Sequence, residues 1–257
     1  MTPDARLRLA EQFAMIAEAA GARIMAVYGS AGVDAKADGS PVTEADLVAH
    51  QAILEGLARD CPGIPVVSEE DAAHRAPDPH DRFILVDPLD GTREFISRNG
   101  EFTVNIALVE AGCPVAGVVL APALGRVWVG AVGAGAQKRA IGEPAWHPIA
   151  CRRPADDGVV CVASRSHRDA TTDAFLAEQT VAGLRSVGSS LKFCLVAEGQ
   201  ADVYPRFGPT MEWDTAAGQA VLEAAGGQVL TPDGAPFRYG KSGWRNGPFI
   251  GWGAVPG

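Results

Sequence analysis

An apolar run that ends in two aspartates, three positions apart, constrains the fold of this chain more than any other feature. Residues 84–92 read Ile-Leu-Val-Asp-Pro-Leu-Asp-Gly-Thr. The apolar start predicts a β-strand, Pro88 predicts a turn, and Gly91 with Thr92 predicts the opening of a helix. Carboxylates at a strand end, beside backbone N–H groups at a helix start, can hold a divalent cation and a phosphate together. A surface turn with a capping threonine is the simpler alternative for this segment alone.

Acidic residues also follow a second predicted strand. Residues Ile64–Ser68 are mostly apolar and run into Glu69-Glu70-Asp71. If this strand lies beside the one predicted at Arg82–Val86, Glu69 comes to lie next to Asp87. Taken alone, three successive acids are more often a solvated turn.

A fourth carboxylate stands far along the chain, where Asp214 opens a helix predicted over Trp213–Ala225. By itself it could be a simple helix cap. The larger set, which combines hard oxygen ligands from three strand or loop ends, consists of Glu69, Asp87, Asp90 and Asp214. Without a cation these acids would repel one another strongly. A magnesium site therefore explains them better than coincidence does.

A candidate proton acceptor stands at the start of another helix. Residues Glu44–Arg59 are predicted to be helical, with Thr43 as the N-cap and Asp46 in the first turn. Asp46 could accept a hydrogen bond from Thr92, and a threonine polarised in this way can orient or deprotonate a water molecule shared with a metal. The alternative is that Asp46 only favours the helix dipole.

The pattern of elements changes near residue 156. Before it, a helix at Arg6–Tyr28 and valine-rich runs over Thr103–Val132 predict an α+β domain with an antiparallel meander, residues 1–156. After it, strands and helices alternate and predict an α/β domain, residues 157–257. The predicted strands there are Val159–Ala163, Leu184–Val187, Asp202–Tyr204 and Gly227–Leu230, and the predicted helices are Asp169–Val181, Ser190–Glu198 and Trp213–Ala225. No role is assigned to the tail after Tyr239.

Composition narrows the class of protein. The formal net charge of −9, from 31 acidic and 22 basic residues, argues against nucleic-acid binding. It would also repel an anionic substrate unless bound cations intervened. The first residues lack a secretory signal, and no apolar run is long enough to span a membrane. Five cysteines without a C-x-x-C pair predict free thiols in a reducing cytoplasm, so we expect a cytoplasmic protein.

Four separated motifs, in order, resemble the inositol-monophosphatase-like superfamily of lithium-sensitive, magnesium-dependent phosphatases. Its pattern is an Asp, then E-E, then D-P-[IL]-D-[GS]-T, then W-D-x-x-x-G. Here the matching residues are Asp46, Glu69-Glu70, residues 87–92 and residues 213–218. The resemblance implies a layered αβαβα sandwich of the sugar-phosphatase type.

A narrower resemblance covers nearly the whole chain. Residues 92–108 and 188–209 look like the 3'(2'),5'-bisphosphate nucleotidases of the CysQ type. Those enzymes remove the 3'-phosphate of adenosine 3',5'-bisphosphate, giving AMP, and so clear a by-product of sulfate assimilation. The resemblance implies a phosphoric monoester hydrolase that acts on a small nucleotide.

The resemblance also implies a role for each matching position. Two or three Mg²⁺ ions would be bound by Glu69, Asp87, the Leu89 carbonyl, Asp90 and Asp214. Asp46 and Thr92 would form the proton-accepting pair. The backbone of Gly91 and Thr92 would hold the phosphate, and the nucleotide would be contacted by Ser164, His167, Gly188 and Lys192. Without the resemblance, His167 would be taken for a surface or core histidine and Lys192 for a solvated helix residue.

The expected reaction is an in-line attack of a metal-activated water on phosphorus, without a covalent phosphoenzyme. One alternative keeps this chemistry with inositol phosphate or histidinol phosphate as the substrate. Another is a non-catalytic sensor of metal or nucleotide. Peripheral association with the inner membrane is conceivable from the resemblance, although no amphipathic segment demands it, and the oligomeric state stays open.

Overall fold

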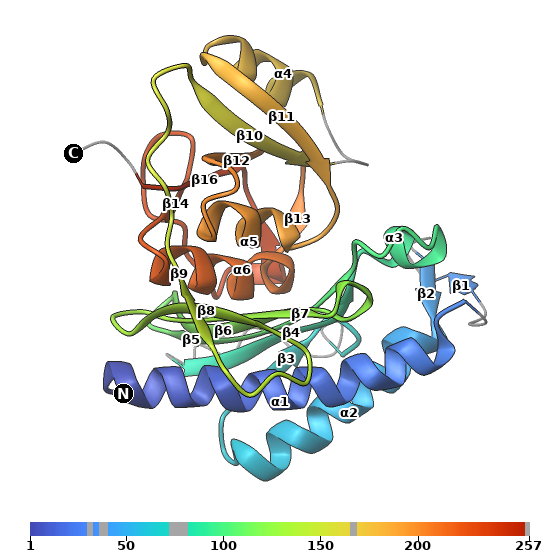
Figure 1. Cartoon of the computed structure of the whole chain (residues 1–257). Coiled ribbons are helices and arrows are strands. Elements are labelled where there is room, and N and C mark those ends of the chain that lie inside the picture. Colours follow the sequence, from blue (N-terminus) through green and yellow to red (C-terminus); the bar gives the residue numbers. More distant parts are fainter. Residues whose placement is uncertain (30–32, 36–40, 72–81, 165–168, 255–257) are drawn as a thin grey trace.

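The computed structural model describes residues 1–29, 33–35, 41–71, 82–164 and 169–254. Five layers are stacked in it (Figure 1). Two long helices, α1 (Pro3–Val27) and α2 (Glu44–Asp60), cover the outer face of a seven-stranded sheet. Helices α5 (Leu191–Ala197) and α6 (Glu212–Ala224) lie between this sheet and a five-stranded one, and α4 (Ala170–Ala177) covers the far side. The layered αβαβα sandwich is therefore confirmed.

The seven-stranded sheet is antiparallel except at one edge, where β3 runs parallel to β4. In spatial order its strands are β3 (Val66–Ser68), β4 (Arg82–Asp90), β5 (Thr103–Glu110), β6 (Cys113–Ala121), β7 (Arg126–Ala131), β8 (Gly135–Ala140) and β9 (His147–Ile149). A 3-10 turn, η2 (Pro122–Leu124), joins β6 to β7. The predicted meander is confirmed, and so is the predicted neighbourhood of β3 and β4.

Alternation along the strands divides the core between two layers. On β4, Ile84 and Val86 face the layer of α1 and α2, whereas Phe83 and Leu85 face the layer of α5 and α6. Successive side chains of a strand point to opposite faces, so a sheet covered on both sides needs nearly continuous apolar strands. The valine-rich runs of the sequence meet this need.

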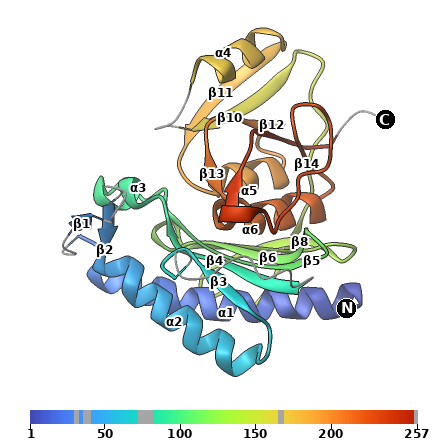
Figure 2. The same cartoon turned by 180° about the vertical axis from the view of Figure 1, so that it is seen from behind.

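The five-stranded sheet has the spatial order β11 (Val181–Val187), β10 (Val159–Ser164), β12 (Val203–Arg206), β16 (Phe249–Trp252) and β14 (Gln228–Leu230). β10 runs parallel to β11 and β12, whereas β16 is antiparallel to both of its neighbours. The C-terminal tail, which was given no role, thus supplies an interior strand of this sheet. Figure 2 shows this half of the molecule from behind.

Several element boundaries differ from the prediction. The helix expected over Asp169–Val181 ends at Ala177, because Val181 already belongs to β11. The strand expected to stop before Asp87 continues to Asp90 through a register shift, so the expected turn is a bulge inside β4. The polar segment around residue 156 connects β9 to β10, and the division into two domains stays a prediction.

Three short pieces complete the fold. α3 (Thr92–Ile96) follows β4 directly. A small antiparallel pair, β1 (Val33–Ala35) and β2 (Pro41–Thr43), precedes α2. A second pair, β13 (Thr210–Met211) and β15 (Arg245–Asn246), lies beside the start of α6, with a 3-10 turn η3 (Ser242–Trp244) before β15.

Two further expectations concern the cysteines and membrane-spanning helices. All five cysteines are free, as predicted. No helix within the described part of the chain is both long and apolar enough to cross a lipid bilayer.

Close packing of α6 against the large sheet depends on small residues in β6 and β7. A Cβ atom added at Gly130 would lie 2.5 Å from Cα of Val221, and one at Gly117 would lie 3.0 Å from Cα of Ala217. Both neighbours are helix backbone, which cannot move aside alone. These glycines therefore set the distance between α6 and the sheet.

We expect Gly130→Ala to lower the free energy of unfolding by about 1–3 kcal/mol, because the added methyl pushes α6 away from β7. Gly247→Ala is a matched control, since a Cβ there meets nothing within 4 Å. Urea denaturation of both variants measures the difference. Equal stability of the two variants would contradict the packing argument.

Candidate active site

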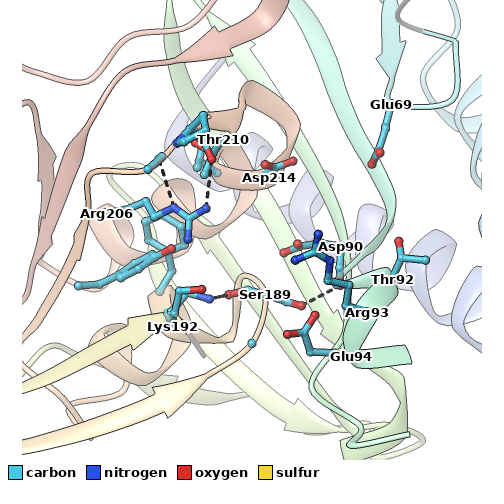
Figure 3. A pocket seen from close by; sticks show the side chains of 18 of the residues that line it. Glu69, Asp90, Thr92, Arg93, Glu94, Ser189, Lys192, Arg206, Thr210 and Asp214 are labelled. Atoms are coloured by element: carbon cyan, nitrogen blue, oxygen red, sulfur yellow. Dashed lines mark hydrogen bonds between the residues drawn. The ribbon is translucent and has the colours of Figure 1, made fainter. Parts of the chain in front are cut away.

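A cavity of about 600 Å³ opens where the two sheets and α6 meet. Figure 3 shows carboxylates and cationic side chains gathered around it. Its polar lining comes from both halves of the chain: Glu69, Asp90, Thr92, Arg93, Glu94, Ser164, Asp169, Ser189, Lys192, Arg206, Thr210, Asp214 and Thr215. Most of the predicted site residues are therefore brought to one place.

The edge of the large sheet brings the first carboxylates together. Ser68 is in register with Val86, and the N–H of Glu69 donates to the Val86 carbonyl oxygen at 3.1 Å. Glu69 therefore follows β3 at the level where Asp87 follows Val86 on β4. The predicted proximity of Glu69 and Asp87 is confirmed.

Asp87 lies at the centre of this cluster. It is 1% exposed, and its Oδ1 accepts a hydrogen bond of 3.0 Å from the Leu89 N–H. Burial raises its pKa well above the ordinary value, and the negative charges of Glu69, Asp90 and Asp214 raise it further. Four carboxylates from three separate motifs thus influence one another electrostatically.

Asp90 is held by donors from two other segments. Its Oδ2 accepts from the Ser190 N–H at 2.7 Å, and Thr103 Oγ1 and Asn105 Nδ2 each lie 3.4 Å away. Burial raises the pKa of Asp90, while the charge of Lys192 and the Ser190 N–H lower it in part. The carboxylate is therefore oriented before any ligand arrives.

Asp214 belongs to the first turn of α6. Its Oδ2 accepts from the Met211 N–H at 2.8 Å, so it also caps the helix. Burial raises its pKa well above the ordinary value, and repulsion by Asp90 and Glu69 adds to the rise. Capping and a ligand role are compatible here, because a carboxylate has two oxygens.

The chemistry of this donor set fits divalent cations. Carboxylates whose pKa values are raised by burial and by mutual repulsion are stabilised by a hard cation that pairs with them. Among the described residues, no group of three or more histidine, cysteine or acidic side chains has the geometry of a metal site in this structure.

Gly91 carries the backbone from β4 into α3. It has φ 93°, in the left-handed region, and a Cβ there would lie 2.1 Å from Ser189 Oγ. Only glycine fits both demands. The predicted helix opening at Gly91 and Thr92 is confirmed. Because α3 has only five residues, its dipole is weak. The first N–H groups of any helix lack partners within the helix, so those of α3 can donate to an anion.

Asp46 is 2% exposed at the start of α2. Its Oδ2 accepts from the Thr43 N–H and from Thr43 Oγ1, both at 2.7 Å. α3 packs against β2, so Thr92 and the junction of Thr43 and Asp46 belong to contacting elements. A hydrogen bond from Thr92 to Asp46 stays a prediction.

The segment after β11 ties the two halves of the site together. The Gly188 N–H donates to Glu101 Oε2 at 2.9 Å, and Ser189 Oγ lies 2.8 Å from the carbonyl oxygens of both Asp90 and Glu101. Ser190 Oγ donates to the Asp214 carbonyl oxygen at 2.7 Å. This segment therefore joins Asp90, at the end of β4, to Asp214, at the start of α6.

Lys192 is 4% exposed, so it is not the solvated helix residue of the simpler interpretation. Its Nζ donates to the carbonyl oxygens of Ser189 at 2.6 Å and Val187 at 3.2 Å, below the ring of Tyr204. Burial lowers its pKa to about 8, and the negative charge of Asp90 opposes that shift. Lys192 shapes the turn and adds positive charge to the cavity wall.

Other site predictions have mixed outcomes. Ser164, the last residue of β10, and Gly188 both line the cavity. His167 lies outside the described residues. The Leu89 side chain is buried in the layer of α1 and α2, and its carbonyl as a metal ligand stays a prediction.

Sequence reasoning missed Arg93, Arg206 and the two serines Ser189 and Ser190. Arg206 ends β12, is 8% exposed, and donates from Nε and one terminal nitrogen to the carbonyl oxygens of Gly208 and Pro209. The signal available in the sequence was an arginine directly after the apolar residues 203–205. In Figure 3, Arg206 and Lys192 lie across the cavity from Glu69 and Thr92.

Comparisons with known proteins agree on one family. The model described as the inositol monophosphatase family matches residues 7–249. The 3'(2'),5'-bisphosphate nucleotidase CysQ of Escherichia coli strain K12 is 49% identical over 233 residues, which is 89% of this chain and 93% of that protein. The namesake from Buchnera aphidicola is 38% identical over 91% of this chain and 89% of that protein.

Solved structures share the fold. The crystal structure of CysQ from Bacteroides thetaiotaomicron, a bacterial member of the inositol monophosphatase family, superposes with a TM-score of 0.82 at 41% identity. The superposition covers 97% of this chain and 98% of that one. An inositol monophosphatase from Anabaena gives 0.76 at 25% identity, over 98% and 92% of the two chains.

The raised pKa values of Asp87 and Asp214 predict how stability depends on pH. Protonation is favoured in the folded state, so the stabilising contribution of these groups is complete below the ordinary pKa of 3.8 and is lost as pH rises through the raised values. In EDTA, we expect the midpoint of thermal unfolding to fall from pH 5 to pH 8. Mg²⁺ should remove most of that fall.

Asp87→Asn provides the control for this pH effect, because it keeps an acceptor for the Leu89 N–H and removes one charge. In EDTA at neutral pH it should unfold at a higher temperature than the wild type and gain less from Mg²⁺. A variant less stable than the wild type under those conditions would rule out repulsion as the cause.

Proposed function

This chain belongs to the inositol monophosphatase family, and on that premise we propose that it is a magnesium-dependent 3'(2'),5'-bisphosphate nucleotidase. Its substrate would be adenosine 3',5'-bisphosphate, cleaved to AMP and phosphate. The Escherichia coli nucleotidase named above, which is 49% identical over 89% of this chain, supports this substrate class.

One observation carries the proposal. A single cavity holds a carboxylate cluster at one end and Arg206 with Lys192 at the other. A monophosphate needs only the anion site that the carboxylates and cations create together. Arg206 and Lys192, whose charges also act on Asp214 and Asp90, add a cationic wall that suits a substrate with a second phosphate.

The cations would be held by the carboxylate cluster described above, together with the Leu89 carbonyl oxygen. The cluster consists of Glu69, Asp87, Asp90 and Asp214. When bound, Mg²⁺ would neutralise phosphate oxygens and lower the pKa of the attacking water. This would also answer how a chain with a net charge of −9 accepts an anion.

The chain's own groups would then position the reactants. Backbone N–H groups of Gly91 and Thr92 would donate to the scissile phosphate, at the turn where Gly91 is required. Thr92 would accept the proton of the attacking water and pass its own proton toward Asp46, which Thr43 holds in place. The nucleoside would lie along Ser164 and Gly188, between the two phosphate positions.

A phosphate-release assay tests the function. With Mg²⁺, kcat/KM should be higher for adenosine 3',5'-bisphosphate than for inositol 1-phosphate or histidinol phosphate, and both EDTA and Li⁺ should inhibit. Asp87→Asn should lower kcat by more than about 100-fold, because a central cation ligand is lost. Equal or better hydrolysis of inositol phosphate would refute the substrate assignment, and nucleotide binding without turnover would favour a sensor.

Arg206 offers a test of the second phosphate position. Two of its N–H groups bind carbonyl oxygens, and a guanidinium has five. Arg206→Ala should raise KM for the bisphosphate roughly 10- to 100-fold, the worth of a hydrogen bond to a charged group, with a smaller change in kcat. KM for a monophosphate should stay nearly constant.

Arg185→Ala is the matched control for that variant, because Arg185 is exposed on β11 and bonds Gln200. It should leave both KM values unchanged. An equal rise of KM for mono- and bisphosphates in Arg206→Ala would show that Arg206 does not recognise the second phosphate.

We propose that the enzyme works in the cytoplasm, where its free thiols would stay reduced. Cell fractionation tests this location. Recovery of the activity in a washed membrane fraction would instead support peripheral attachment.

A further inference from the structure

Asn105 on β5 lies at the centre of the polar contacts around Asp90. The side chain is 1% exposed. Its Nδ2 lies 3.1 Å from Ser190 Oγ and 3.4 Å from Asp90 Oδ2. Because an ionised carboxylate can only accept hydrogen bonds, these neighbours assign the amide nitrogen to this side and the amide oxygen to the other.

The amide oxygen of Asn105 has no hydrogen-bond donor among the described residues, although it is buried. Leaving a buried acceptor unpaired costs roughly 1–3 kcal/mol, and most such acceptors are satisfied by protein or by ordered water. An unpaired oxygen here therefore indicates a missing hydrogen-bond donor.

The position of Asn105 indicates where that donor would be. Asn105 is in register with Asp87 across β4 and β5. Directly opposed residues of an antiparallel pair project from the same face, with Cβ atoms about 4.5–5.5 Å apart. The amide thus lies between two carboxylates, Asp87 and Asp90, that the proposed function assigns to the cations.

We propose that Asn105 is a positioning residue of the cation site. Its N–H joins the Ser190 N–H and Thr103 Oγ1 on Oδ2 of Asp90 and leaves the other carboxylate oxygen for the cation. Its amide oxygen accepts a hydrogen bond from the hydration water of a divalent cation. This inference rests on the proposed function for the identity of the cation.

An amide suits this place better than a carboxylate does. Asp87 lies directly across from position 105, and Asp90 Oδ2 lies 3.4 Å from the amide nitrogen of Asn105. An aspartate at position 105 would add another negative charge to the cluster, whereas asparagine supplies a donor and an acceptor without charge.

Isothermal titration of the EDTA-stripped protein with Mg²⁺ tests the inference without substrate. Asn105→Leu, which keeps the number and branching of the side-chain heavy atoms, should weaken Mg²⁺ binding about 10- to 100-fold and reduce the rise in Tm that Mg²⁺ produces. Asn105→Asp should lower Tm in EDTA more strongly at pH 8 than at pH 5, with recovery in Mg²⁺. Should the leucine variant not fold, Asn105→Ser carries the same titration, because its shorter side chain cannot reach both partners.

Val129→Ala on β7 is the control for general destabilisation, since Val129 is buried in the layer of α1 and α2, away from the cavity. It should lower Tm and leave the Mg²⁺ affinity unchanged. Wild-type Mg²⁺ affinity in the Asn105 variants would overturn the inference.

These titrations, together with the phosphate-release assay, separate this inference from the proposed function. If the wild type binds Mg²⁺ and the variants bind it weakly, but no bisphosphate is hydrolysed, only the proposed function fails. If the wild type hydrolyses the bisphosphate and the variants bind Mg²⁺ equally well, only the role of Asn105 fails.

Discussion

Electrostatic repulsion among buried carboxylates is the constraint on which the rest of this structure depends. Asp87 is nearly inaccessible, yet the charges of Glu69, Asp90 and Asp214 all act on it. Such a cluster destabilises a metal-free fold at neutral pH, so the scaffold must hold it by other means. The sheet does so with apolar strands that are covered on both faces, and α6 packs closely on glycines of β6 and β7. Binding of divalent cations would then convert repulsion into attraction, which makes affinity for cations and stability of the fold two aspects of one interaction.

The segment from Gly188 to Ser190 connects the parts of the site that come from the two halves of the chain. Gly188 binds the Glu101 carboxylate, Ser189 lies against the carbonyl oxygens of Asp90 and Glu101, and Ser190 connects Asp90 with the backbone of Asp214. These short contacts join residues that are between 24 and 100 positions apart in the sequence. A change in the relative position of the two sheets would therefore alter the carboxylate cluster directly. Aromatic contacts of about 5 Å among Tyr28, Phe95 and Phe102 hold α3 from the opposite side.

Charge is separated across the cavity in a way that serves an anionic substrate. The acidic end is suited to cations, and the end with Arg206 and Lys192 is suited to phosphate directly. The side chains of Arg206 and Lys192 are both held in place, because each donates hydrogen bonds to two backbone carbonyl oxygens. Preorganised cations lose little conformational entropy on binding. A substrate with two phosphates would thus be held at both ends, with the P–O ester bond of its scissile phosphate beside the carboxylate cluster.

The amino-acid sequence by itself determined the elements and the ligand motifs, because both are local. Strand periodicity, the helix cap at Thr43 and the spacing of Asp87 and Asp90 depend on neighbours a few positions away, and the order of four motifs indicated the family. Only the tertiary structure decided what depends on distant partners. The tail after Tyr239 became the interior strand β16 because β12 and β14 were both available to pair with it. Lys192 became a buried cation because the carbonyl oxygens of Val187 and Ser189 surround its ammonium group. Asn105 looked like one more residue of an apolar strand, and only register with Asp87 and contact with Ser190 placed it at the site, since hydrogen bonds across a fold leave no periodic pattern in the chain.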